Sequence, residues 1–166
     1  MAKAGRKVKK RKSTEAGTPE SRAEALAARN EATGSEEETL ELARELARDF
    51  RGDEVILLSG ELGAGKTIFA KGIAAGLGMK NWSQVCSPSF TIMNIYEARY
   101  PIYHFDLYRL EKKADILDLG WEDYLDRGIV IVEWGERVPF GLKAIRINIR
   151  KGRGDRRVIE IRRAAS

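Results

Sequence analysis

The sequence is poor in several features that define large classes of proteins. It has one cysteine, Cys86, which cannot form a disulfide within the chain, and one histidine, His104, which argues against a histidine-based metal site. Its longest apolar runs, residues 55–58 and 129–132 among them, have four residues each, whereas a membrane-spanning helix needs about 20. No apolar stretch near Met1 resembles a secretory signal. These absences predict a soluble protein of the reducing cytoplasm, in which Cys86 is a small buried apolar residue.

Positive charge is concentrated at the N-terminus. Of the 30 Lys/Arg and 25 Asp/Glu residues, residues 1–34 hold nine and four, which leaves 21 of each sign in the rest. Seven of the first twelve residues are Lys or Arg, and such a segment buries too little apolar surface to become ordered. We therefore expect residues 1–34 to be a basic, disordered extension, with at most a short helix within 20–29, and residues 35–166 to form one domain. The extension is interpreted either as an electrostatic arm for RNA or as a solubilising tail.

Hydrophobic periodicity predicts an α/β fold. Ser35 and Glu38 have the spacing of a helical capping box, and the apolar residues that follow recur at helical spacing to about Arg51. The run 55–58 predicts a strand, and residues 66–77 predict a second helix. Further strands are predicted at residues 91–96, 101–105, 129–132, 144–149 and 157–162, and helical turns within 116–125. The expected architecture is a mixed sheet flanked by helices, as in P-loop NTPases, with strands 55–58 and 129–132 central and antiparallel pairs at the margins.

A glycine-rich segment carries the most specific chemical signal. Residues 60–67, Gly-Glu-Leu-Gly-Ala-Gly-Lys-Thr, match the pattern G-x-x-x-x-G-K-[ST] and stand between a predicted strand and a predicted helix. In this setting backbone N–H groups and the helix N-terminus bind the phosphates of a nucleotide. Lys66 would reach the β- and γ-phosphates, and the Thr67 hydroxyl would bind the Mg²⁺ that bridges them. The segment thus predicts a site for ATP and Mg²⁺.

Such a site also needs carboxylates at strand ends. Glu133 directly follows the apolar run 129–132 and is the candidate metal ligand. Asp106 ends another predicted strand, and it is interpreted either as a group that orients the attacking water or binds the metal through water, or as the cap of a turn. His104, on the same strand as Asp106, is expected to be structural.

The hydroxyl-rich segment 85–91 is a candidate switch loop. Pro88 keeps it out of a helix. Ser87, Ser89 and Thr91 could sense the γ-phosphate, and the alternative is a turn whose hydroxyls form local hydrogen bonds.

Four segments, in this order along the chain, resemble the bacterial TsaE family, also called YjeE: residues 58–67, 87–91, 104–110 and 132–134. The resemblance implies a small ATPase that binds ATP and Mg²⁺, hydrolyses ATP slowly, and acts with a TsaB-TsaD pair. That pair would transfer threonylcarbamoyl to the adenosine beside the anticodon of tRNA. The resemblance assigns Gly63, Ala64, Gly65, Lys66 and Thr67 to the phosphates and Glu36 to the approach of adenine. It also assigns Thr67 and Glu133 to Mg²⁺, and Asp106, together with Lys66 and Glu133, to turnover at the nucleotide.

Two features depart from the family pattern. Ser89 stands where the family more often has Thr, which keeps a hydroxyl. The basic extension 1–34 has no counterpart in the family, so the resemblance implies no role for it.

Two other functions fit parts of the sequence. A stand-alone small-molecule kinase would use the same loop, although the chain leaves little room for a separate lid. A basic RNA-binding module with a vestigial loop is disfavoured by the intact Lys66, Thr67 and Glu133. Several arginines near the C-terminus permit RNA contact, and a solvated strand face explains them equally well: Arg146, Arg150, Arg153, Arg156 and Arg157.

Overall fold

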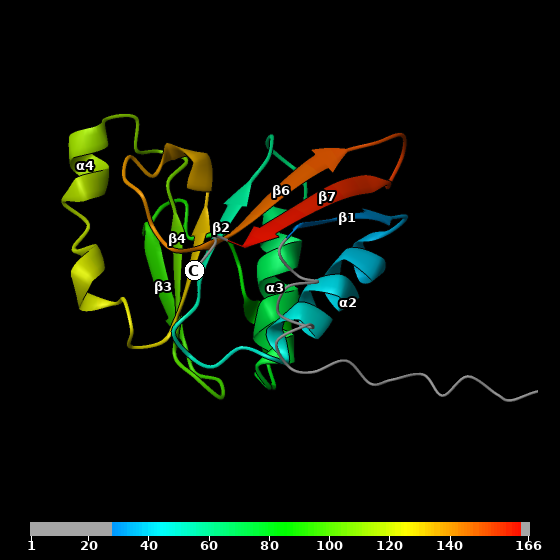
Figure 1. Ribbon diagram of the computed structural model, residues 1–166, viewed down its shortest axis with the longest axis horizontal. Helices are drawn as coiled ribbons and strands as arrows, with labels where there is room; N and C mark the ends of the chain where they lie inside the picture. The colour runs from blue at the N-terminus through cyan, green and yellow to red at the C-terminus, as the bar shows by residue number, and fades with distance from the viewer. Residues whose placement is uncertain (1–27, 164–166) are drawn as a thin grey trace, which may run out of the picture.

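The structure is a computed structural model, and it describes residues 28–163. Within these residues seven strands form one mixed sheet in the order β1-β7-β6-β2-β5-β4-β3 (Figure 1). The strands are β1 (Ala28–Thr33), β2 (Val55–Ser59), β3 (Met93–Tyr96), β4 (Ile102–Asp106), β5 (Ile129–Glu133), β6 (Ile145–Lys151) and β7 (Arg157–Arg163). The predicted single α/β domain is confirmed.

The centre of the sheet is parallel and its margins are antiparallel. β2 pairs in parallel with β5 and with β6, and β4 pairs in parallel with β5. β3 pairs antiparallel with β4 at one margin, and β6, β7 and β1 form antiparallel pairs at the other. Residues 55–58 and 129–133 are buried throughout, as is typical of strands covered on both faces. The predicted centre and margins of the sheet are therefore confirmed.

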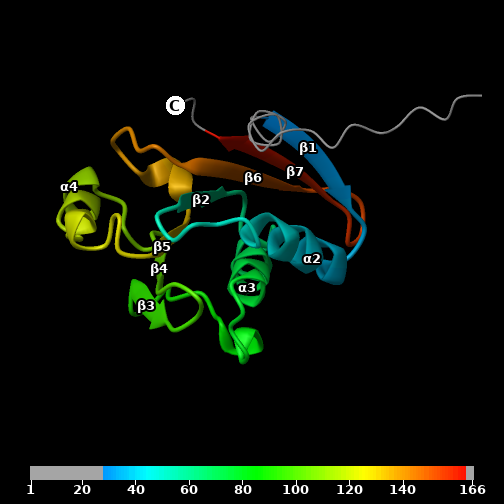
Figure 2. The same cartoon turned by 60° about the horizontal axis from the view of Figure 1, so that its bottom comes forward.

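Helices cover the two faces unequally (Figure 2). α2 (Glu36–Ala47) and α3 (Lys66–Gly76) lie on one face, where Leu58 of β2 and Phe69 of α3 belong to one buried cluster. The shorter α4 (Lys113–Leu117) and the 3-10 turn η2 (Trp121–Asp123) lie on the other face, where Trp121 stacks on Phe105 of β4. Two further 3-10 turns are η1 (Trp82–Gln84) and η3 (Gly135–Arg137). No helix among residues 28–163 has the length and apolarity needed to cross a membrane.

α2 begins where the sequence predicts and ends earlier. Ser35 Oγ accepts a hydrogen bond from Glu38 N at 3.1 Å, and the Glu38 carboxylate reaches back to the amide before Ser35 at 2.7 Å. The helix ends at Ala47 and not near Arg51. The reason is tertiary, because the Arg99 guanidinium donates hydrogen bonds to the carbonyl oxygens of residues 47, 48 and 50.

The domain begins earlier than the predicted boundary at Ser35. β1 consists of residues that the sequence analysis assigned to the extension 1–34, and it pairs with β7 from Ala28 to Thr33. Thr33 is buried, and its hydroxyl lies 2.8 Å from that of Thr39 in α2. Residues 28–33 are therefore part of the sheet. The rest of the expected extension, including most of the predicted helix within 20–29, lies outside the described residues.

Other differences from the sequence prediction are local. β3 starts at Met93 and not at residue 91, because Ile92 has a φ of 69°. The helical turns predicted within 116–125 are two pieces, α4 and η2, and Gly120 turns the chain between them at a φ of 69°. Cys86 is exposed, so its predicted burial is wrong.

Candidate functional site

The glycine-rich segment forms the connection between β2 and α3. Gly60, Gly63 and Gly65 have φ angles of 149°, 73° and 115°, which residues with a Cβ rarely adopt. At Gly60 a Cβ would lie 2.4 Å from the Ile149 carbonyl oxygen, so only glycine fits between the loop and β6. The strand-loop-helix setting that the motif requires is confirmed. The binding of phosphate by this loop stays a prediction.

Lys66, the first residue of α3, is folded against the loop. Its Nζ donates hydrogen bonds to the carbonyl oxygens of Gly60 and Glu61, at 2.6 and 2.9 Å, and lies 4.1 Å from the centre of the Trp134 ring. Burial lowers the pKa of Lys66 below the ordinary lysine value, and nearby carboxylates, with Glu133 foremost, oppose this shift. A cation that has lost part of its hydration and lies at the loop is suited to binding phosphate oxygens.

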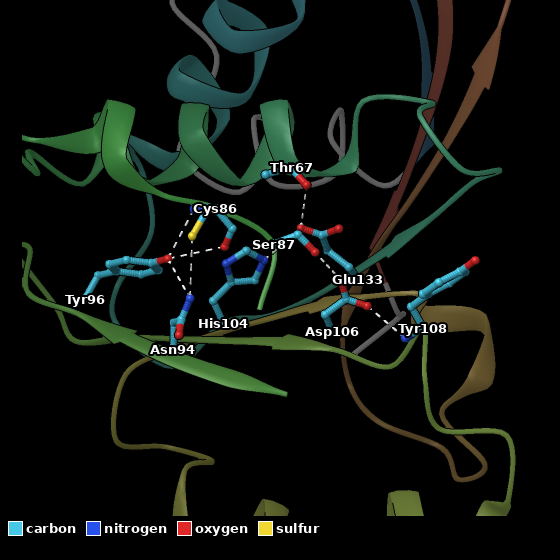
Figure 3. Close-up of polar contacts among 9 residues, drawn as sticks. All are labelled: Thr67, Cys86, Ser87, Asn94, Tyr96, His104, Asp106, Tyr108 and Glu133. Carbon is cyan, nitrogen blue, oxygen red and sulfur yellow. Dashed lines mark hydrogen bonds and ion pairs between the residues drawn. The ribbon is translucent and has the colours of Figure 1, made fainter. Parts of the chain in front are cut away.

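Glu133 joins three elements of the fold (Figure 3). Its Oε1 accepts a hydrogen bond from Thr67 Oγ1 of α3 at 3.0 Å, and the same oxygen lies 2.9 Å from His104 Nε2 of β4. Glu133 is 3% exposed, and His104 is fully buried. His104, which the sequence analysis expected to be structural, therefore contacts the candidate metal ligand directly.

The oxygens of Thr67 and Glu133 fit one edge of a Mg²⁺ coordination octahedron. With metal–oxygen distances of about 2.1 Å, neighbouring ligands of an octahedral ion lie about 3.0 Å apart, and these two oxygens are 3.0 Å apart. Within residues 28–163, no three His, Cys, Asp or Glu side chains are grouped so that they could hold a metal ion. The Thr67 hydroxyl and the Glu133 carboxylate are oxygen donors, which is the kind of ligand that Mg²⁺ prefers.

Asp106 lies beside Glu133, because β4 and β5 are in register at their carboxyl ends. Asp106 is 3% exposed. Its Oδ1 accepts a hydrogen bond from Tyr108 N at 2.8 Å, and its Oδ2 accepts one from the Ser87 hydroxyl (Figure 3). The carboxylate thus caps a turn and also lies next to the candidate metal ligand. Its role as a turn cap therefore does not exclude a role in orienting water or in binding the metal through water.

The candidate switch loop reaches the site through one residue. Ser87 contacts Asp106, whereas Thr91 is exposed and donates a hydrogen bond to Asn94 Oδ1 at 3.3 Å. Ser89 stands between them in the sequence and is half-buried. The structure therefore brings Ser87, and not Thr91, to the carboxylate of Asp106.

Two charged residues, Glu36 and Arg157, connect the start of α2 to the loop. Glu36, at the start of α2, is exposed, and its Oε1 lies 3.5 Å from Arg157 Nη2. Arg157 begins β7, is 8% exposed, and donates a hydrogen bond from Nε to the Ala64 carbonyl oxygen at 2.9 Å. The start of α2 is thus connected to the glycine-rich loop through Arg157. The interpretation of Arg157 as part of a solvated strand face is wrong.

Comparison with known proteins identifies the family of the chain. A model of the family described as "Threonylcarbamoyl adenosine biosynthesis protein TsaE" matches residues 33–159. The chain belongs to the TsaE family. The tRNA threonylcarbamoyladenosine biosynthesis protein TsaE of Aquifex aeolicus is 46% identical over 104 residues, which cover 62% of this chain and 74% of that protein. The protein of the same name from Rickettsia typhi is 33% identical over 132 residues, or 78% of this chain and 91% of that protein.

Two further comparisons define how far the similarity to the TsaE family extends. The Rickettsia conorii TsaE protein is 42% identical over 103 residues, and the chain spans 58% of the length of that relative. The crystal structure of YdiB from Bacillus subtilis matches with a TM-score of 0.68 and 31% identity, over 83% of this chain and 86% of that one. The resemblance inferred from four sequence motifs is therefore confirmed at the level of family and fold.

Strand alternation could have predicted two residues that the structure places at this candidate site, His104 and Arg157. His104 and Asp106 are two residues apart on β4, so their side chains share a face of the sheet. Arg157 shares the inward face of β7 with Ile159 and Ile161, which are fully buried. The sequence predicts Arg157 as one of several arginines of a solvated strand face and His104 as a structural residue, so neither is predicted to belong to the site.

Proposed function

We propose that this chain is a Mg²⁺-dependent ATPase that binds ATP at residues 60–67 and hydrolyses it slowly when alone. It acts with TsaD-like and TsaB-like subunits in the formation of threonylcarbamoyladenosine on tRNA, in the cytoplasm. Family membership supports this role, as do the names of the relatives in Aquifex aeolicus and Rickettsia typhi. The chain contacts the tRNA either indirectly, through these subunits, or directly, through the basic N-terminal residues.

The observation that carries the proposal is the contact between Thr67 and Glu133. It joins the residue after the loop lysine to the end of a neighbouring strand, across 66 positions of sequence. P-loop NTPases hold Mg²⁺ with a Ser or Thr directly after the loop lysine, the position of Thr67 here. They also use an acidic residue at the end of a neighbouring strand, the position of Glu133 here. The motif alone predicts only the Thr67 hydroxyl. The contact of this hydroxyl with the Glu133 carboxylate is therefore independent support for a site that binds a nucleotide and a metal.

The loop and its lysine bind and orient the nucleotide in this account. Lys66 exchanges its hydrogen bonds to two loop carbonyls for bonds to phosphate oxygens, where its charge offsets the charge that develops on the transferred phosphoryl group. The main-chain N–H groups of residues 63–65 orient the phosphates. Mg²⁺, when bound by Thr67 and Glu133, supplies further charge neutralisation. In this account Glu36, which Arg157 connects to the loop, approaches the adenine.

Asp106 orients the attacking water in this account. Its buried carboxylate lies beside Glu133 and accepts hydrogen bonds from a main-chain amide and from the Ser87 hydroxyl. The amide fixes the direction of the carboxylate, while the bond from Ser87 can be exchanged for one from water. A water that donates a hydrogen bond to Asp106 is held in place for attack on the γ-phosphate.

ATP turnover, measured with and without the candidate partner pair and tRNA, tests this function. We expect slow Mg²⁺-dependent hydrolysis by the chain alone and faster hydrolysis in the full mixture. Lys66→Ala is the inactive control, and Lys80→Ala, which changes an exposed lysine, is the matched one. Rapid phosphoryl transfer to a small-molecule acceptor, with no effect of the partners, would favour the kinase function instead. An absence of turnover in every mixture would contradict the proposal.

A further inference from the structure

Arg157 is a buried cation that contacts the glycine-rich loop. Its guanidinium donates hydrogen bonds from Nε to the Ala64 carbonyl oxygen and from Nη1 to the Asp155 carbonyl oxygen, both at 2.9 Å. Its Nη2 lies 3.5 Å from a carboxylate oxygen of Glu36, whose side chain is 60% exposed. Water competes for so exposed a carboxylate, so that ion pair holds Arg157 only weakly. The bond to Ala64, buried and well formed, is the strongest connection between Arg157 and the loop.

This bond acts on a single peptide group. The carbonyl of Ala64 and the N–H of Gly65 belong to the same planar unit and point in opposite directions. A donor that fixes the direction of the carbonyl therefore also fixes the direction of the N–H, which points the opposite way. A cation at the carbonyl also polarises the peptide and strengthens the N–H as a donor. Inward N–H groups are the ones that phosphate-binding loops use.

Gly65 is a position at which the backbone needs such support. Glycine populates positive and negative φ with similar ease, so its own sequence does not fix the φ of 115° that it adopts here. A Cβ at Gly65 would lie 2.9 Å from Arg157 Nε. Glycine at this position therefore makes room for the guanidinium, and the guanidinium in turn restrains the peptide that glycine leaves mobile.

We propose that Arg157 is a positioning residue of the nucleotide site. Its hydrogen bond to Ala64 fixes the peptide between Ala64 and Gly65 so that the Gly65 N–H faces a phosphate oxygen of the bound nucleotide. The β6–β7 hairpin is then part of the site, although Arg157 follows the loop by 93 positions. The inference rests on the proposed function, because it requires that residues 60–67 bind a nucleotide.

Binding of ADP, measured by titration calorimetry, tests the inference in three variants. Arg157→Gln should weaken binding by about tenfold or more, because the charge-assisted bond to Ala64 is lost. Arg157→Lys should weaken it less, because it keeps the charge but not the planar fork. Arg156→Gln is the matched control. Arg156 precedes Arg157 and carries the same charge, but its side chain is exposed, so its replacement should change the affinity for ADP by less than about twofold.

A second readout separates positioning from a general loss of stability. The Gly65 amide resonance should shift strongly when ADP is added to the wild-type protein and much less in Arg157→Gln, in samples whose thermal unfolding shows that both are folded. If Arg157→Gln does not fold, the same two measurements are made on Arg157→Lys. Wild-type affinity with a wild-type Gly65 shift in the folded variant would overturn the inference, as would an equal loss of affinity in Arg156→Gln.

The same titrations distinguish failure of the inference from failure of the proposed function. A wild-type protein that does not bind ADP rejects both. A wild-type protein that binds ADP, an Lys66→Ala variant that does not, and an Arg157→Gln variant that binds normally would reject the inference alone.

Discussion

His104 Nε2 lies 2.9 Å from Glu133 Oε1, and both side chains are buried. Because Oε1 belongs to a carboxylate, the ring nitrogen is the donor of this hydrogen bond. Within residues 28–163, the other ring nitrogen, Nδ1, is buried and has no hydrogen-bond partner. The hydrogen bond from the His104 ring therefore fixes the orientation of the oxygen that also contacts Thr67.

Replacement of His104 should raise the Mg²⁺ concentration that nucleotide binding requires. His104→Leu removes the donor, and loss of a group that orients a metal ligand typically weakens metal binding by about tenfold or more. His104→Gln should restore much of the affinity, because its amide nitrogen is as many bonds from Cβ as Nε2 of the imidazole. Titration of Mg²⁺ into each variant in the presence of ADP measures the Mg²⁺ concentration that nucleotide binding requires. Equal Mg²⁺ requirements in the wild-type and Leu proteins would show that His104 only fills space.

Lys66→Ala should abolish ATP-dependent function. The loop brings the phosphates closest to this side chain, so loss of its ammonium leaves their charge uncompensated there. Calorimetric titration with ATP measures the loss, and Lys80→Ala should bind as the wild type does. Wild-type affinity in Lys66→Ala would mean that residues 60–67 do not bind phosphate.

Asp106→Asn should lower the rate of ATP hydrolysis more than it lowers nucleotide affinity. The amide keeps the shape of the side chain and can still accept from Tyr108 N, but it is a poorer acceptor for the attacking water. Comparison of kcat with the dissociation constant for ATP separates the two effects. A parallel fall in both would assign Asp106 to binding, and an unchanged kcat would leave it as the cap of a turn.

Deletion of residues 1–34 should destabilise the domain, although the sequence alone predicts that it would leave folding intact. The deletion removes β1, which exposes the edge of β7 and the buried hydroxyl of Thr39. We expect the unfolding temperature to fall by at least about 4 °C, which corresponds to about 1 kcal/mol or more for a domain of this size. Deletion of residues 1–27 is the matched control, because it leaves every described contact in place. Equal unfolding temperatures for the two truncated proteins would show that β1 contributes no stability.

The same 1–27 deletion tests the RNA-arm interpretation of the basic N-terminus. Seven basic residues among the first twelve could contact several phosphates, so their loss should weaken tRNA binding and flatten its dependence on salt. An unchanged affinity and slope across a salt series would reject the arm.

Local sequence patterns predicted the parts of the fold that depend on local chemistry. The capping box at Ser35, the glycine-rich connection and the carboxylates after two strands all follow from residues close in sequence. β1 could not be predicted, because its residues, Ala-Arg-Asn-Glu-Ala-Thr, have little strand preference and become a strand only through pairing with β7. The early end of α2 likewise depends on Arg99, about 50 positions away.

The site shows the same division between local and tertiary information. The motif identified Lys66 and Thr67, and strand ends identified Glu133 and Asp106. That Glu133 meets both Thr67 and His104 depends on the order of the strands, which places β5 between β2 and β4. No local pattern contains that order.

Hydrolysis of ATP by Glu133→Gln, measured beside the wild-type protein across a Mg²⁺ series, tests the central claim most directly. The amide keeps the size of the side chain and its contact with Thr67, but it lacks the charge that holds a hard cation. We expect the wild-type rate to rise with Mg²⁺ and saturate, while the variant retains much of its nucleotide affinity and shows little turnover at any Mg²⁺ concentration. Wild-type turnover by Glu133→Gln, with the same Mg²⁺ dependence, would contradict the assignment of Thr67 and Glu133 as the metal-binding pair of an ATPase.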